Sequence, residues 1–541
     1  MTVFINFLKK DNYIIRISSL IILIFIIYSR SHPGSDQLYQ IGSAFNFIKG
    51  NGFSEVFFDG NDLIFKELNR WPRFYSLLIS LFLFFSKDPN FSFLGVEFIC
   101  YGFFLLALYK TLFLIFKDSA NKHLAINLVS ISLATSIAPF KYGTGIDVMC
   151  VSVFLFSATF MYKYYFETNK PSYLIALFIG LSVVCQMRYD YLPKVLMFFV
   201  FIIIIEIIKK DYLKHMFLKI LLSFIFLGSF FSIYLSAFFQ TSSPGAANLL
   251  TVQTINFDSY WNVLYAPFIN SYFPDFVIYT FISKVINSTL VEYYYLFVAL
   301  LSLTSLIVLI LLLNNFSIKQ ILKNLENYFL QIILLFFSFA NLITLIVVYG
   351  LFEFYNLSWI ENPYTISYSG LSVVNRYFLL LHVSVFLLSL YYGLKLNNKF
   401  FKFLIFCSVI FGFTHFCYLF SRYSIDKAEN LKLVSTPSEI YIDCQEMNTI
   451  FSLENDKTNL FIPLNKSDIV FNRQIRPSQI AISNGFVIFN SSDSLLGVEK
   501  LKSKFDNIYI CNYSNNNTFN KGFETIYEGK IYSLHRKIND Q

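Results

Sequence analysis

Long apolar stretches, separated by short polar segments, run through most of the chain and predict membrane-spanning helices. A spanning helix needs about 20 mostly apolar residues. Candidate stretches lie at 13–29, 91–116, 124–140, 145–162, 172–188, 192–208, 216–240, 291–313, 328–351, 376–394 and 400–420. The segment 74–86 is apolar but short for a straight crossing. The pattern therefore predicts an all-α polytopic membrane protein of about 11 to 13 transmembrane helices.

The pattern changes near residue 424, where short apolar runs alternate with segments rich in Asn, Ser, Lys and Asp. Runs of strand length, bounded by turn residues, occur at 439–442, 459–463, 486–489 and 507–510, and 495–505 favours a helix. We expect residues 1–423 to form the membrane domain and residues 424–541 to form a small soluble α/β domain.

Composition agrees with this class, because 56% of the 541 residues are hydrophobic and only 14% are charged. The net charge of +8 does not indicate nucleic acid as a partner, because the lysines gather in short loops beside apolar stretches. Such loops lie on the cytoplasmic side of a membrane. This rule places the N-terminus inside, and the first loop (30–73) and the tail outside, as expected for a bacterial inner-membrane protein with an extracytoplasmic C-terminal domain.

The span count contains a conflict around residues 74–140. The loops 30–73 and 141–145 both read as outer loops, so an even number of spans must separate them. The stretches 74–86, 91–116 and 124–140 are three. Either 74–86 lies along the outer interface, or two of the three stretches are divided differently.

The first outer loop carries the strongest candidate chemistry. Residues 36–49 contain no proline, and their apolar residues stand near helical spacing at Leu38, Ile41, Phe45 and Ile48. This predicts an amphipathic helix along the membrane surface, closed by the glycines that follow it. Asp36 falls in its first turn, where backbone N–H groups and the helix dipole favour an ionised carboxylate. A carboxylate at that position suits the role of a base.

Three segments resemble the GT-C glycosyltransferases, notably the protein mannosyltransferase and aminoarabinose transferase branch. The first outer loop resembles theirs in the run His32-Pro33-Gly34-Ser35-Asp36-Gln37-Leu38-Tyr39, followed by Gly50-Asn51-Gly52 and Arg70-Trp71-Pro72-Arg73. Ala138-Pro139 with Gly145-Ile146-Asp147 resembles the second outer loop, and Asn375-Arg376-Tyr377-Phe378 resembles the late Arg-Tyr pair. The resemblance implies many membrane helices, amphipathic helices in the first outer loop and a soluble domain on the non-cytoplasmic side.

The resemblance implies transfer of a sugar from a polyprenyl-phosphate carrier to an acceptor hydroxyl on a lipid, glycan or protein. It makes Asp36 the base that accepts the hydroxyl proton. It makes Asp147 a second catalytic carboxylate, which orients the acceptor or, as in metal-using relatives, helps to hold a divalent ion. Arg376 suits the lipid phosphate, because a guanidinium bonds two oxygens at once. No paired Asp-x-Asp occurs in the first loop, so the sequence requires no cofactor, although a divalent metal is compatible with the resemblance.

Other residues join the site as substrate-binding candidates: Tyr39, Lys141, Arg188 and Asp190. Some of the candidates also have a structural interpretation. Arg188 and Asp190 suit an ion pair that seals a helix junction, and Arg376 suits an interfacial anchor.

The seven cysteines show no zinc spacing, and Cys444 and Cys511 in the tail are candidates for a disulfide if that domain faces an oxidising compartment. Two other function classes stay open, a flippase or transporter of lipid-linked sugars and a polysaccharide polymerase or ligase. A transporter concentrates ionisable groups near the membrane midplane, whereas here they stand at the ends of the apolar stretches.

Overall fold

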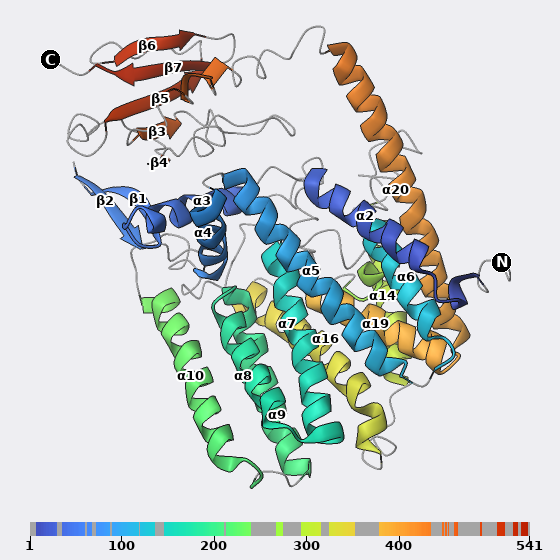
Figure 1. Ribbon diagram of the computed structural model, residues 1–541. Coiled ribbons are helices and arrows are strands. Elements are labelled where there is room, and N and C mark those ends of the chain that lie inside the picture. The colour runs from blue at the N-terminus through green and yellow to red at the C-terminus, as the bar shows by residue number, and fades with distance from the viewer. Residues whose placement is uncertain are drawn as a thin grey trace. The chain divides into compact units, whose positions relative to one another are not determined.

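The fold is that of a computed structural model (Figure 1). It describes residues 7–29, 35–59, 62–67, 72–86, 89–117, 119–135, 145–209, 213–239, 267–273, 294–314, 324–351, 378–433, 446–447, 449–451, 453, 459–463, 487–488, 506–513, 523–528 and 532–538. The chain divides into two compact units. Unit 1 comprises Met1–Ile27 and Glu97–Leu419, and unit 2 comprises Tyr28–Val96 and Phe420–Gln541.

Unit 1 is helical. Its helices, some of which extend into unit 2, are α2 (Tyr13–Ser29), α5 (Pro89–Ile115), α6 (Lys122–Thr135), α7 (Gly145–Tyr162), α8 (Pro171–Cys185), α9 (Leu192–Lys209), α10 (Met216–Phe239), α14 (Tyr294–Asn314), α16 (Leu325–Leu351), α19 (Leu379–Leu390) and α20 (Lys399–Leu433). Unit 1 also contains two π-helical segments, η2 (Lys163–Thr168) and η6 (Tyr391–Lys395), and two short 3₁₀ helices, η3 (Tyr189–Tyr191) and η4 (Ile269–Ser271).

Within the described residues, five helical segments are long and apolar enough to cross a membrane: Phe91–Ile115, Gly145–Thr168, Tyr189–Lys209, Met216–Ile233 and Leu325–Ile346. Shorter apolar helices accompany them at Tyr13–Ile24, Phe74–Ser86, Pro171–Cys185, Ala299–Asn314 and Leu379–Lys395. The chain is therefore an integral membrane protein. The predicted class, a mostly helical membrane protein with a small C-terminal sheet domain, is confirmed.

Aromatic side chains fill the contact between α7, α9 and α16. Phe154 of α7 packs edge-to-face on Phe337 of α16, with ring centroids 5.1 Å apart, and at 5.8 Å from Phe198 of α9. All three rings are fully buried. Figure 1 shows α7, α8, α9 and α10 side by side, and α8 contacts each of the other three. This packing fixes the positions of the helix ends that carry the charged residues described below.

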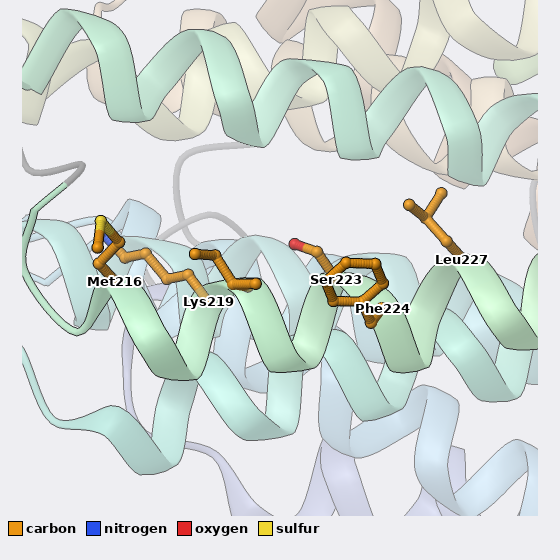
Figure 2. Close-up of a pocket in the computed structure, with 6 residues that line it drawn as sticks. Met216, Lys219, Ser223, Phe224 and Leu227 are labelled. Atoms are coloured by element: carbon orange, nitrogen blue, oxygen red, sulfur yellow. The ribbon is translucent and has the colours of Figure 1, made fainter.

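A mostly apolar pocket lies along α10, and Figure 2 shows residues of this helix that line it. Met216, Lys219, Ser223 and Leu227 stand three or four residues apart along the helix and so share one face, and Phe224 lies beside Ser223. Phe224 is 70% exposed, which is the exposure expected of a side chain that meets lipid. Lys219, at one end of this face, forms an ion pair with Glu206 at 2.6 Å.

Unit 2 contains helices α3 (Ser35–Ile48) and α4 (Phe74–Ser86), the hairpin β1 (Ser54–Asp59) and β2 (Asp62–Glu67), and a five-stranded sheet. Helix α3 lies where the sequence predicts it, but the residues that it buries are not those that the helical spacing of apolar residues predicts. Ile41 and Ala44 are buried and Ile48 is exposed, because α3 packs on α4, β1 and β4. Helix α4 has 13 residues, which matches the expectation of a segment short for a straight crossing.

The sheet is mixed, with strand order β4-β3-β5-β7-β6. Its strands are β3 (Asn459–Pro463), β4 (Val487–Ile488), β5 (Asn507–Tyr513), β6 (Phe523–Glu528) and β7 (Tyr532–Lys537). Strands β3, β4 and β5 are parallel, and β7 is antiparallel to β5 and β6. Phe451, Phe461 and Tyr509 pack edge-to-face in its core.

Two predicted elements of the tail, 439–442 and 495–505, lie outside the described residues. Cys511 is buried on β5, and Cys444 lies outside the described residues, so their disulfide stays a prediction.

Candidate functional site

Four charged side chains meet where α7 begins and where the chain passes from α8 to α9. We call Asp147, Arg188, Asp190 and Lys194 the charged cluster. Asp147 stands in the first turn of α7, and Lys194 in the first turn of α9. Arg188 has an extended backbone and precedes the turn η3, which contains Asp190. The return from α8 to α9 is therefore short, and it carries Arg188 and Asp190 to the start of α7.

Arg188 joins the cluster by bonding two carboxylates. Its Nη1 donates to Oδ1 of Asp147, and its Nε donates to Oδ1 of Asp190 at 2.6 Å. Lys194 Nζ lies 3.4 Å from the other oxygen of Asp190 and 3.9 Å from the ring centroid of Tyr191. The side chains of Asp147 and Lys194 are 2% and 0% exposed. Their charged groups are therefore shielded from water, and the opposite charges in the cluster must stabilise them.

Glu97 holds the start of α7 from the neighbouring helix α5. The backbone N–H of Gly145 donates to both carboxylate oxygens of Glu97, each at 3.0 Å. A carboxylate at the N-terminus of a helix is favoured by the helix dipole and by the N–H groups that lack intrahelical partners. A Cβ atom at residue 145 would lie 2.4 Å from Oε1 of Glu97. Glycine at this position therefore allows the close approach.

Glu97 and Lys194 are functional candidates that the sequence interpretation missed. Each is an ionisable residue inside or beside an apolar stretch, and such residues mark functional sites in membrane helices. That signal was present in the sequence. Their partners were not visible, because Glu97 and Gly145 are 48 residues apart and the contact depends on how α5 packs beside α7.

The geometry defines what the charged cluster can do chemically. Oδ1 of Asp147 already accepts a bond from Arg188, so this carboxylate is better placed to orient a group than to take up a proton. The predicted pair of Arg188 and Asp190 at a helix junction is present. Among the described residues, no three His, Cys, Asp or Glu side chains form a group that could hold a metal ion, and a divalent metal stays a prediction.

The structure brings together three of the seven predicted site residues: Asp147, Arg188 and Asp190. Asp36 and Tyr39 lie on α3, in unit 2, and their side chains are not among those described. Lys141 and Arg376 lie outside the described residues. The catalytic and substrate-binding roles of all seven stay predictions.

Comparison with known proteins gives two solved structures and no family. No family model matches the chain, and no curated protein matches it. The structure of ArnT from Cupriavidus metallidurans bound to undecaprenyl phosphate aligns at a TM-score of 0.48 and 8% identity, covering 97% of this chain and 98% of that one. The apo structure of the same protein aligns at a TM-score of 0.43 and 10% identity, with the same coverage.

ArnT is a GT-C glycosyltransferase, the class that the sequence motifs resemble. Both TM-scores are under 0.5, so the functional argument rests on the residues of this chain.

Proposed function

We propose that the protein is an integral membrane glycosyltransferase of the GT-C type. It would transfer a sugar from a polyprenyl-phosphate carrier to an acceptor hydroxyl on the non-cytoplasmic face of the membrane. The observation that carries the proposal is the buried ion pair of Asp147 with Arg188 at the start of a membrane helix. Buried charges are costly in a membrane protein and are kept where function uses them. The first-loop helix that begins at Ser35, with Asp36 as its second residue, supplies a candidate base.

The reaction needs a base, a path for the leaving group and a fixed acceptor. The acceptor oxygen bonds to the anomeric carbon of the sugar, while the bond between that carbon and the phosphate oxygen breaks. The phosphate leaves on the polyprenyl carrier with the electron pair, and the hydroxyl proton passes to Asp36. Arg376 would bond the phosphate oxygens as their charge develops.

The charged cluster supports this assignment by its rigidity. Arg188 is bonded to two carboxylates and Glu97 anchors the first turn of α7, so Asp147 is held in one position. A polar group that is fixed before the substrate arrives needs no reorganisation in the transition state. We assign Asp147 to orienting the acceptor, with Arg188 and Glu97 as positioning residues.

The test is transfer of a radiolabelled sugar from membrane lipid to an extractable acceptor, with the wild type and Asp36→Asn at matched membrane expression. Loss of the base is expected to lower the rate by about 10²- to 10⁴-fold, while binding of the lipid donor is retained. Asp62→Asn is the matched control, because it makes the same change of charge in the same loop, where residue 62 pairs with residue 59 across the hairpin.

Two outcomes would contradict the proposal. Equal transfer by Asp36→Asn and wild type would remove Asp36 as the base. Movement of the labelled lipid across the membrane, with no transfer by the wild type, would identify a flippase.

A further inference from the structure

The hydroxyl of Tyr191 is buried beside the charged cluster. Tyr191 is the last residue of η3 and directly precedes α9. Its ring centroid lies 5.8 Å from that of Phe154 and 3.9 Å from Nζ of Lys194, and the residue is 2% exposed. Within the part of the chain that the structure describes, the hydroxyl has no hydrogen-bond partner. A buried hydroxyl without a partner lowers stability, so its presence at this position calls for a reason.

Lys194 has hydrogen-bonding capacity that the protein does not use. Its side chain is 0% exposed, and among the described residues Nζ has one acceptor, Oδ2 of Asp190, at 3.4 Å. An ammonium group has three donors. One points to Asp190 and one can face the ring of Tyr191, which leaves a donor for another group. This donor and the hydroxyl of Tyr191 therefore lie close together.

The charges around these two donors favour a neutral ligand. The two carboxylates of the charged cluster balance its two cations, so the cluster has no net charge. Glu97 adds a negative charge at the start of α7. A phosphate or carboxylate would therefore meet no excess of positive charge. A hydroxyl oxygen has two lone pairs and can accept a hydrogen bond from each donor without bringing a charge.

The charged cluster reaches the protein surface at the edge formed by Arg188 and Asp190, whose side chains are each 15% exposed. Asp190 directly precedes Tyr191, so this edge gives a substrate group a route toward the hydroxyl. The charges of Asp147 and Asp190 both act on that hydroxyl. It therefore stands near the carboxylate to which we assign the orientation of the acceptor.

We propose that Tyr191 and Lys194 bind a neutral hydroxyl oxygen of the acceptor, beside the group that Asp147 orients. The bound oxygen is a second oxygen of the acceptor and not the attacking one, because two donors would withdraw the lone pairs that attack requires. The inference rests on the proposed function and adds a binding residue, Tyr191, to it. It also explains the unpaired hydroxyl, since a group kept for a substrate is not bonded within the protein.

The test is Tyr191→Phe in the assay of sugar transfer from membrane lipid. This change keeps the ring that packs on Phe154 and faces Lys194, and it removes only the hydroxyl. We expect the rate of transfer to fall by about threefold to tenfold, the range of one hydrogen bond, while binding of the labelled lipid donor is retained. The midpoint of thermal unfolding in detergent should equal or exceed that of the wild type, because a buried unpaired hydroxyl has been removed.

Tyr392→Phe is the matched control. Tyr392 is fully buried in η6, outside the charged cluster, and Nε2 of Gln331 donates to its hydroxyl at 2.5 Å. Here the protein itself uses the hydroxyl, so its removal should lower the unfolding midpoint. Transfer per folded molecule should stay at the wild-type rate. The two variants are thus expected to separate stability from transfer in opposite ways.

Three outcomes would overturn the proposal. Tyr191→Phe could transfer sugar as fast as the wild type. It could lose transfer together with stability, which would make the hydroxyl structural. It could bind the labelled lipid more weakly, which would assign the hydroxyl to the donor. Absence of transfer by the wild type would instead remove the proposed function, and this inference with it.

Discussion

Arg188 is bonded to two carboxylates at once, so its charge decides the stability of the charged cluster. In Arg188→Gln, the buried Asp147 and Asp190 would lose their shared guanidinium. We expect the free energy of unfolding to fall by about 3–5 kcal/mol, the cost of leaving a buried charge unpaired. Thermal or denaturant unfolding of the purified protein in detergent measures this change.

The matched control is Lys117→Gln, which removes one partner of the largely exposed Lys117–Glu167 pair. An exposed pair contributes about 0–1 kcal/mol, so this variant should unfold close to the wild type. If Arg188→Gln were equally stable, the cluster would not depend on that guanidinium. The double variant Asp147→Asn with Arg188→Gln should recover part of the loss, because one of the two stranded charges is gone.

Gly145 gives a second residue-scale prediction, which depends on space and not on charge. In Gly145→Ala the new methyl group would lie 2.4 Å from Oε1 of Glu97, so the Glu97 carboxylate must move and its bonds from the N–H of residue 145 are weakened. Overpacking of this kind costs about 1–3 kcal/mol, and thermal unfolding in detergent measures it. Gly102→Ala on α5 is the control, because no atom lies within 4 Å of its added Cβ.

Replacing glycine in a helix interior by alanine gains about 0.5–1 kcal/mol, so the control should be slightly more stable than the wild type. The free energy of unfolding is expected to fall in Gly145→Ala and to rise in Gly102→Ala. This difference in sign attributes the loss to the contact with Glu97. Glu97→Ala removes the group that clashes, so Gly145→Ala should cost less stability in the Glu97→Ala background than in the wild type. An equal cost in both backgrounds would contradict this explanation.

At the scale of elements, the sequence predicted the helices closely. The expected stretch 145–162 coincides with α7, and 216–240 ends one residue beyond α10. A helix that is apolar on all sides is visible without knowledge of its neighbours, because the membrane itself provides its environment. For the same reason the apolar pattern carries no information on which helices touch.

The strands of the tail were harder to predict. The apolar runs at 459–463 and 507–510 coincide with β3 and with the first part of β5. Strands β6 and β7 were missed, because their sequences FETIYE and YSLHRK carry charges on strands at or beside the sheet edge. Glu524 and Arg536 pair there at 2.6 Å, directly opposite each other. Such cross-strand pairs stabilise a sheet without an apolar signal.

The site was predicted in part, for reasons of the same kind. Asp147, Arg188 and Asp190 drew attention as charges at the ends of apolar stretches. The bond between Asp147 and Arg188 crosses 41 residues and a complete helix. The two residues meet only because α8 packs antiparallel beside α7. No local sequence pattern predicts that packing.

At the scale of the whole molecule, unit 2 makes a prediction about membrane topology. It combines residues 28–96 with residues 420–541, and within it α3 contacts β4. A compact unit formed by the first loop and the soluble tail must lie on one side of the membrane. An even number of crossings therefore separates the two segments. This agrees with the placement of lysines, which puts both segments outside.

Cysteine labelling tests this prediction. In a variant whose seven native cysteines are replaced, Asn51→Cys and Glu528→Cys should both react with a membrane-impermeant maleimide in intact cells, since both positions are exposed. Lys170→Cys, in the lysine-bearing segment between η2 and α8, should react only after permeabilisation. Labelling of Asn51→Cys and Glu528→Cys from opposite sides would separate the first loop from the tail. The candidate base Asp36 would then lie across the membrane from the soluble domain, and the proposed reaction would lose its common compartment.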